Sequence, residues 1–201
     1  MQNVSATLAA LVGSRLCHDL ISPIGAIQNG LELIALSGAD QSSPEMTLIQ
    51  DSCASAAARI RFFRVAYGAA GEAQMMSRRE IAGILSGVTS GGRLTAEWSA
   101  AEDQPRPEVQ LCFLAFQCCE SALPMGGAVR IENDAAGWTV RASGARINGD
   151  RTYWDHINGA APLDTPPPDK VHFALLPILA AMRGRQLLAT LTDDSITLKI
   201  A

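Results

Sequence analysis

The sequence has no excess of positive charge, no long apolar run and no motif that would bind a metal. Its 16 Lys and Arg residues are outnumbered by 20 Asp and Glu residues, which gives a net charge of −4. Because nucleic-acid-binding proteins usually carry a basic excess, this balance argues against that class of partner. No apolar run approaches the roughly 20 residues that cross a bilayer, so we expect no membrane span.

Signals for export and for cysteine chemistry are also missing. Residues 1–10 lack the basic segment and the apolar core of an export signal, so we expect a cytoplasmic protein with reduced thiols. The five cysteines form no Cys-x-x-Cys pair and have no histidine at zinc spacing. We therefore predict no metal site, structural roles for His156 and His172, and buried, inert thiols at Cys17, Cys53, Cys112, Cys118 and Cys119.

What is present is the composition of a folded protein. Apolar residues make up 48% of the chain and charged residues 18%, whereas a disordered chain is poorer in apolar residues and richer in net charge. A length of 201 residues allows one large domain or two small ones. The pattern of the sequence changes near residue 71, which predicts a helical domain over residues 1–71 and a mixed domain over residues 72–201.

The first domain is predicted to be an antiparallel helical hairpin. One helix is expected from Ser5 to about Ser37, and a second begins with Ser43 as its N-cap and Pro44 as its first residue. Gly68 closes the second helix. Apolar residues recur at alternating spacings of three and four along both helices, which is a heptad pattern: Leu16, Leu20, Ile24, Ile27, Leu31 and Ile34 in the first, and Ile49, Cys53, Ala56, Ile60, Phe63 and Tyr67 in the second.

An apolar stripe on each of two helices needs more protein to cover it. Two helices alone cannot surround a core, and the simplest source of further helices is a second copy of the chain. We therefore predict a homodimer that forms a four-helix bundle. The alternative is that the hairpin packs on the rest of its own chain.

The second domain alternates helices and strands. Ser77 and Glu80 form a capping box that opens a helix, and an almost entirely apolar helix is expected over residues 108–123. We interpret residues 143–170 as a loop because they are rich in proline. Further elements are expected at strands 93–99, 128–132 and 138–142, helix 171–182, and strands 186–192 and 196–200. The order fits an α+β fold in which the hairpin precedes a two-layer α/β sandwich.

One histidine of the first helix lies off its apolar stripe. His18 is two residues from both Leu16 and Leu20, so it points about 200° around the helix from them, towards solvent. The neighbouring Asp19 can hydrogen-bond and orient the imidazole. Pro23 removes a backbone donor and can bend the helix just beyond.

This segment resembles the H-box of sensor histidine kinases, with the pattern His, Asp or Glu, Leu, Arg, Thr or Ser, Pro, Leu. The matching residues are His18, Asp19, Leu20, Ser22, Pro23 and Ile24, and Ile21 stands where that family has Arg. The place of the box on the first helix of a long hairpin, followed by an α/β sandwich, strengthens the resemblance. It implies a dimerisation hairpin followed by a kinase-type ATP domain.

The second domain resembles that ATP domain with its nucleotide-binding residues lost. Where the family has an Asn box, this chain has Gln117 and Ser121. Residues 142–146 keep one Gly of the Asp-x-Gly-x-Gly motif and lack its Asp, and residues 172–175 contain no Gly. Without those glycines the backbone cannot approach phosphates closely. We expect no ATP-binding residues and no self-phosphorylation.

An H-box with a degenerate ATP domain, in a stand-alone chain, is similar to the ChpT-type histidine phosphotransferases of alphaproteobacteria. The resemblance implies that a phosphorylated receiver domain transfers its phosphoryl group to His18, which passes it to the Asp of another receiver. The partners would be receiver domains of a hybrid histidine kinase and of response regulators. Any Mg²⁺ would sit on the receiver, and the protein would hold no cofactor. A dimeric adaptor without phosphoryl chemistry and an ATP-dependent kinase remain as alternatives.

Three neighbours share the helix face of His18. Ser14 and Arg15 precede it by four and three residues, and Ser22 follows it by four. These side chains are candidates for binding phosphoryl oxygens. The alternative for each is an ordinary solvated surface residue.

A surface for the receiver is expected at the same height of the hairpin. Folding the chain at about residue 40 places His18 beside residue 63. Phe62 lies off the apolar stripe, so it is either an exposed receiver contact or a residue packed against the second domain. The predicted receiver-binding surface combines apolar residues, a glycine and an arginine: Ile21, Pro23, Gly25, Arg59 and Phe62.

Overall fold

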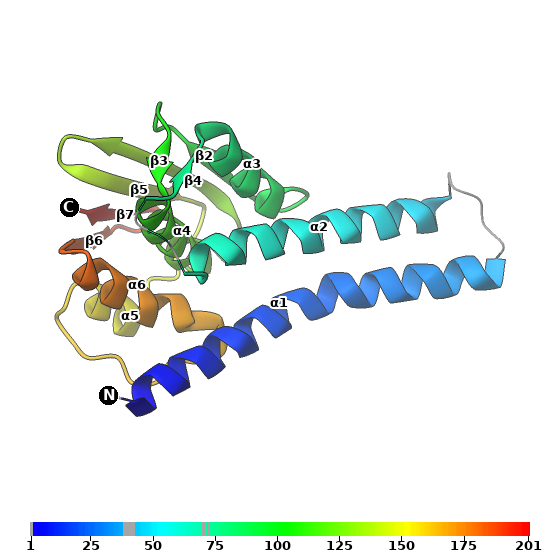
Figure 1. The fold of residues 1–201 in the computed structure, drawn as a ribbon, viewed down its shortest axis with the longest axis horizontal. Helices are drawn as coiled ribbons and strands as arrows, with labels where there is room; N and C mark the ends of the chain where they lie inside the picture. Colours follow the sequence, from blue (N-terminus) through cyan, green and yellow to red (C-terminus); the bar gives the residue numbers. More distant parts are fainter. Residues whose placement is uncertain (1, 38–42, 70, 72) are drawn as a thin grey trace.

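The computed structural model describes residues 2–37, 43–69, 71 and 73–201. Two long antiparallel helices, α1 (Gln2–Ser37) and α2 (Pro44–Ala66), form a hairpin. An α/β sandwich packs around the end of the hairpin that holds the N-terminus, and the other end extends beyond it (Figure 1). The expected hairpin and sandwich are both confirmed, while the expected polar link falls largely on residues outside the described ranges.

Local sequence signals set the bounds and the spacing of the hairpin. Ser43 is the N-cap of α2, and its hydroxyl accepts the backbone N–H of Met46 at 3.2 Å. Gly30 of α1 is buried against Ile49 of α2, because a Cβ built at Gly30 would lie 2.5 Å from the Ile49 Cγ1 atom. Glycine at this position lets the two helices approach closely.

The sandwich contains a five-stranded mixed sheet in the order β2-β4-β5-β7-β6. Only the β2–β4 pair is parallel within this sheet. Val129 and Ile131 point into the core while Arg130 between them is exposed, as the two-residue period of a strand requires. The strands are β2 (Leu94–Trp98), β4 (Gly127–Asp134), β5 (Gly137–Ser143), β6 (Leu187–Leu191) and β7 (Ser195–Ile200).

Three longer helices cover the face of the sheet that is turned to the hairpin (Figure 1). They are α3 (Arg78–Thr89), α4 (Arg106–Ser121) and α6 (Val171–Met182). The capping box predicted for α3 is present in part, since the Ser77 hydroxyl accepts the Glu80 N–H at 3.2 Å. A short ribbon of β1 (Met75–Met76) and β3 (Gln104–Pro105) lies before α4.

The core is continuous from the sandwich into the last turns of α2. Helix α4 is buried on nearly all sides, as its apolar sequence predicts. Phe62 of α2 stacks on Phe113 of α4, with ring centroids 4.8 Å apart and planes 5° from parallel. Phe63, Val65 and Ala66 of α2 belong to the same buried cluster. The end of the hairpin is therefore fixed to the sandwich by apolar packing.

The interpretation of residues 143–170 as a loop is wrong in one part. Helix α5 (Arg151–Ile157) begins at Asp150, whose carboxylate accepts the Thr152 N–H at 3.0 Å. Trp154 and Ile157 are buried in the core. The prolines that suggested a loop all follow this helix, and one of them opens the short 3-10 helix η1 (Pro168–Lys170).

The prediction of buried thiols holds for three cysteines and is wrong for two. Cys112, Cys118 and Cys119 are fully buried, and burial raises the pKa of the Cys119 thiol to about 12. Cys17 and Cys53 are exposed on the hairpin, because the single chain covers only part of the helix surface. Within the described ranges, no helix is long and apolar enough to cross a membrane.

Candidate functional site

The side chain of His18 projects from the middle of α1 into solvent. It is 78% exposed, as its position off the apolar stripe predicts. Its Nδ1 atom lies 3.1 Å from Oδ1 of Asp19. Since the neutral ring carries one N–H, donation from Nδ1 to this carboxylate leaves a lone pair on the solvent-facing Nε2. The geometry therefore presents a nucleophilic nitrogen at the surface.

Asp19 is held by positive charge from both helices of the hairpin. Its side chain is only 9% exposed, and its Oδ2 atom lies 2.9 Å from Arg15 Nη2 and 3.8 Å from Arg59 Nη1. Arg15 is four residues before Asp19 on α1, a spacing that brings side chains together on one helix face. Arg59 comes from α2, so the hairpin fold places it at the height of His18. The two guanidinium groups fix the position of the carboxylate.

Arg15 does not point freely towards the position of a phosphoryl group. Its Nη1 atom donates to the backbone carbonyl of Asp169 at 2.9 Å, and its side chain is 15% exposed. Ser14 and Ser22 are exposed near His18, in agreement with their predicted place on its helix face. The three predicted neighbours thus divide into two surface hydroxyls and one arginine that joins the hairpin to the sandwich.

Three residues of the predicted receiver-binding surface are accessible, and two are buried. Ile21 is 69% exposed, a Cβ at Gly25 would meet no atom within 4 Å, and the side chain of Arg59 is 40% exposed. Phe62 is 3% exposed, so its assignment to this surface is wrong and the alternative packing on the sandwich is confirmed. The remaining residue of the set is Pro23.

Pro23 is also buried, contrary to its assignment to the receiver-binding surface. It lies five residues after His18, which turns it about 140° around the helix away from that side chain. Gly30, seven residues further along, is buried on the same face against α2. Pro23 therefore lies on the inner face of the hairpin.

The positions that correspond to the Asn box are engaged in internal contacts. Gln117 accepts a hydrogen bond from the hydroxyl of Tyr67 at 2.9 Å, and the Ser121 hydroxyl lies 3.0 Å from Nε2 of His172. Burial lowers the pKa of His172 well below its usual value, and Arg15 and Lys170 lower it further. His172 is therefore a neutral core residue, as predicted for a structural histidine.

Aromatic packing beside these positions leaves little space. Tyr153 of α5 stacks on Phe173 of α6 at 4.8 Å, and Trp154 meets the same ring edge-on at 5.4 Å. A pocket of about 140 Å³ remains next to Ser121 and Lys170. Among the described residues, no group of three or more His, Cys, Asp or Glu side chains could hold a metal.

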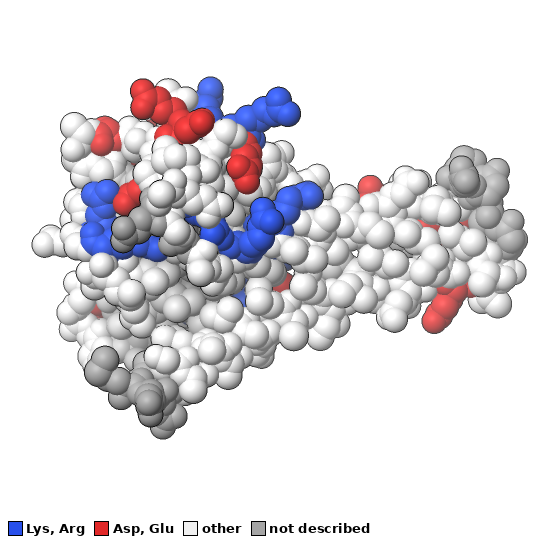
Figure 2. Space-filling model, viewed as in Figure 1, with Lys and Arg blue, Asp and Glu red and all other residues white. Residues whose placement is uncertain are grey.

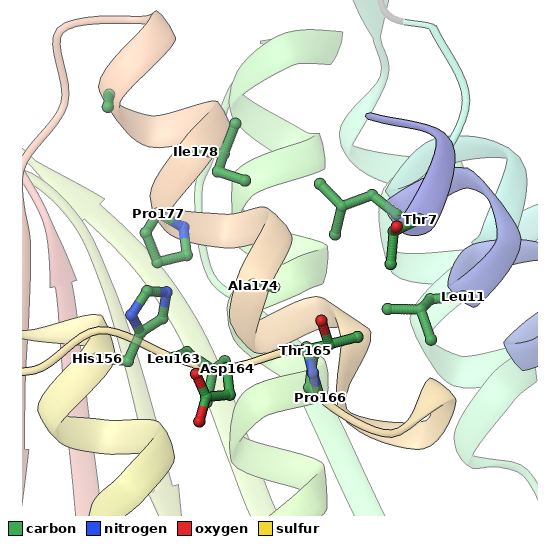
Figure 3. A pocket seen from close by; sticks show the side chains of 12 residues that line it. Thr7, Leu11, His156, Leu163, Asp164, Thr165, Pro166, Ala174, Pro177 and Ile178 are labelled. Atoms are coloured by element: carbon green, nitrogen blue, oxygen red, sulfur yellow. The ribbon is translucent and has the colours of Figure 1, made fainter. Parts of the chain in front are cut away.

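A larger apolar groove lies between the N-terminal part of α1 and α6. It has a volume of about 620 Å³. In Figure 3, Thr7 and Leu11 face Ala174 and Ile178 across its opening, and the other histidine predicted to be structural, His156, lies at its edge. Neither the phosphoacceptor candidate nor its carboxylate partner lines this groove, so it is separate from the site.

Sequence reasoning missed the link from Arg15 to the sandwich. The acceptor is a backbone carbonyl 154 residues away, and a backbone group carries no side-chain signature. The sequence feature that pointed to a fixed carbonyl near Asp169 was the run of prolines at positions 166–168, because consecutive prolines predict a stiff turn.

Comparison with known proteins agrees with this geometry. Residues 78–195 match the histidine phosphotransferase C-terminal domain family. Over 161 residues the chain is 34% identical to protein phosphotransferase ChpT of Brucella abortus (strain 2308), which covers 77% of this chain and 76% of that protein. A solved structure of a bacterial phosphotransferase aligns over 96% of this chain and 95% of its own, with 31% identity and a TM-score of 0.79.

An exposed histidine on a helical hairpin that is joined to an α/β sandwich is an arrangement suited to a protein that relays phosphoryl groups. The chain belongs to the histidine phosphotransferase family. Within that family it is of the ChpT type and acts in a bacterial phosphorelay.

Proposed function

We propose that His18 is the phosphoacceptor of this phosphotransferase. The observation that carries the proposal is its exposed imidazole, with Nδ1 on a buried carboxylate and Nε2 open to solvent. Nε2 attacks the phosphorus of a receiver's aspartyl phosphate, so that an N–P bond forms while the P–O bond breaks. The receiver's aspartate leaves as a carboxylate, and Asp19 offsets the positive charge that develops on the ring. The same steps run in reverse towards the Asp of a second receiver.

The partners follow from this chemistry. The donor and the acceptor are receiver domains, one in a hybrid histidine kinase and the others in response regulators, and Mg²⁺ is bound by the receiver. The surface offered to them surrounds His18 and includes Ile21, Ser22 and Gly25, with positive charge from Arg59. Since receivers and their kinases act in the cytoplasm, we assign the protein to that compartment.

The hairpin is the proposed dimerisation element. Its apolar stripe is left open in the single chain, with Ile24 48%, Leu31 54% and Ile60 53% exposed. The projecting end of the hairpin also shows few charged side chains on the face seen in Figure 2. A second copy would cover these residues and complete a four-helix bundle, at a gain of about 25 cal/mol for each Å² of apolar surface removed from water.

The sandwich is proposed to act without nucleotide. Gln117, Ser121 and Phe173 use the relevant positions for internal contacts, which supports the absence of ATP binding and of autokinase activity. We place the boundary between the hairpin domain and this degenerate domain at residues 71 and 72, between the end of α2 and the start of β1.

The test is phosphoryl transfer from a receiver labelled with radioactive phosphate. The unmodified protein should acquire an acid-labile, base-stable label, and His18→Gln should acquire none. His156→Gln is the matched control, because its Nδ1 faces the carbonyl of Ala161 far along the chain from the site, and it should label normally. Undiminished labelling of His18→Gln would exclude His18.

The same assay separates the alternatives. An adaptor would bind receivers and acquire no label in any variant, and it would tolerate the loss of His18. A kinase would become labelled from Mg-ATP without a receiver.

A further inference from the structure

We propose that Arg15 is a positioning residue through which the sandwich holds His18 in its reactive form. The chain of contacts runs from the Asp169 carbonyl to Arg15 at 2.9 Å, from Arg15 to Asp19 at 2.9 Å, and from Asp19 to His18 at 3.1 Å. The inference rests on the proposed role of His18. It replaces the expectation that Arg15 binds the phosphoryl group itself.

The sandwich end of this chain of contacts is stiff. Asp169 lies in η1, directly after three consecutive prolines at positions 166–168, each of which fixes its own φ. The Lys170 N–H closes the turn on the Pro167 carbonyl at 2.9 Å. The next residues, Val171, His172 and Phe173, are buried. The Asp169 carbonyl is therefore fixed relative to the whole sandwich.

The geometry of Arg15 suits a bridge better than a free phosphate ligand. Its two terminal nitrogens serve two acceptors in different parts of the chain, which the planar fork of a guanidinium allows. Its buried Nε atom has no hydrogen-bond partner among the described residues. An unpaired buried donor is unfavourable, so the observed conformation is one in which the two terminal contacts outweigh that cost.

The other end of the chain of contacts determines which nitrogen of His18 is nucleophilic. Arg15 binds Oδ2 of Asp19, and this leaves Oδ1 directed at Nδ1 of the imidazole. The hydrogen bond made by one ring nitrogen sets the tautomer, and hence the state of the other. Without Arg15, Arg59 at 3.8 Å is the arginine that remains, among the described residues, to orient the carboxylate. The Nδ1–H form of His18 then loses its support.

The test reads the tautomer of His18 directly. Protein labelled with ¹⁵N in its histidines is studied at pH 8 by long-range ¹H–¹⁵N spectra, beside single-turnover transfer and receiver affinity. The unmodified protein should show the Nδ1–H tautomer. Arg15→Met should show a mixture of tautomers and transfer roughly tenfold more slowly, with receiver affinity unchanged. Arg15→Lys should be intermediate, because one ammonium keeps the charge but cannot bridge both acceptors.

Two further variants locate the effect. Arg61→Met, an exposed arginine on α2, is the matched control and should leave the tautomer and the rate unchanged. A double variant, Pro167→Gly with Pro168→Gly, loosens the turn while keeping Arg15, and it should shift the tautomer in the same direction as Arg15→Met. Circular dichroism and thermal melting identify any variant that has lost its fold.

The outcomes are separable from those of the proposed function. An unchanged His18 tautomer in folded Arg15→Met overturns the positioning role. A changed tautomer in Arg15→Met with none in the proline variant restricts Arg15 to the hairpin and overturns the contribution of the sandwich. Neither result needs a receiver, whereas the phosphoacceptor assignment is tested with a labelled receiver and fails if His18→Gln still becomes labelled or if the unmodified protein acquires no label.

Discussion

His18 of the hairpin and His172 of the sandwich are the same side chain in opposite surroundings. The side chain of His18 is 78% exposed, with one nitrogen on a carboxylate and the other in solvent. His172 is fully buried, with Nε2 at 3.0 Å from Ser121 and Nδ1 without a partner among the described residues. An imidazole can react with a large partner when one nitrogen is fixed and the other is reachable. The buried ring of His172 instead packs inside the sandwich.

The same contrast extends to the residues around each histidine. Around His18, charged groups of Asp19, Arg15 and Arg59 meet across two helices and a turn of the sandwich. Around His172, the polar and aromatic side chains contact one another, as in the stacking of Tyr153 on Phe173. In the sandwich, the positions that correspond to the Asn box carry internal contacts, those of Gln117 with Tyr67 and of Ser121 with His172.

The largest expected effect is the loss of the dimer that the hairpin is proposed to form. Ile60→Asp places a charge on the stripe that the second copy would cover, and an uncompensated buried charge is strongly unfavourable. Light scattering at micromolar concentration should report a dimer for the unmodified protein and a monomer for the variant. Arg61→Asp, one residue further and off the stripe, should remain dimeric. A monomeric unmodified protein would contradict the four-helix bundle.

The second prediction concerns the joint between the two regions. Phe62→Ala removes a ring buried against Phe113, and it should lower the free energy of unfolding by about 3–5 kcal/mol. Ile21→Ala, at an exposed position, should change it by less than about 0.5 kcal/mol and weaken receiver binding instead. Urea denaturation and receiver affinity measured on both variants separate the two roles. Equal stability of Phe62→Ala and the unmodified protein would disagree with the packing described here.

The third prediction sharpens the contrast through pH. The pKa of His172 is lowered in the folded state by burial, so the unfolded chain binds a proton below about pH 6.5 that the folded protein does not. Stability is thus fully present above that pH and falls as the pH drops below it, by up to about 1.4 kcal/mol per pH unit. His172→Gln should reduce this slope in urea denaturation between pH 6.5 and 5. A slope unaffected by the substitution would rule out His172 as its source.

The smallest expected effect compares two serines. Ser22→Ala should raise the barrier for transfer by about 0.5–1.5 kcal/mol, the usual worth of one hydrogen bond, with little change in stability. Ser121→Ala, beside His172, should lower the free energy of unfolding by a similar amount and leave transfer unchanged. Single-turnover kinetics and urea denaturation decide between these outcomes. The same response from both serines would remove the distinction between the two regions.

Local signals in the sequence were sufficient for most of the elements. Ser43 and Ser77 cap the helices they were expected to cap, and α6 spans the predicted residues 171–182. These features depend on side chains within a few positions of each other. The exposure of His18 was predictable for the same reason, because helix periodicity alone turns it away from the apolar stripe.

The features that could not be predicted from the sequence depend on contacts between distant parts of the chain. Whether Phe62 is exposed is decided by Phe113, 51 positions later, and heptad spacing contains no information about that surface. Arg15 was read as a surface charge or a phosphate ligand because its partner is a carbonyl of the sandwich. Helix α5 was hidden by the prolines that follow it, although Asp150 is an ordinary N-cap.

Because the core of the sandwich includes the last turns of α2, the two ends of the hairpin should differ in how readily their backbone amides exchange. Because Phe62, Phe63 and Val65 are buried with α4, the backbone amides of that segment should open to hydrogen exchange only together with the sandwich. The turns near Pro44 lie at the end of the hairpin that extends beyond the sandwich (Figure 1), and they should exchange through local fraying. His18, whose neighbour Asp19 faces Arg59 of α2, lies at the height of that segment, so the proposed phosphoacceptor is placed beside the part of α2 that is expected to exchange slowly.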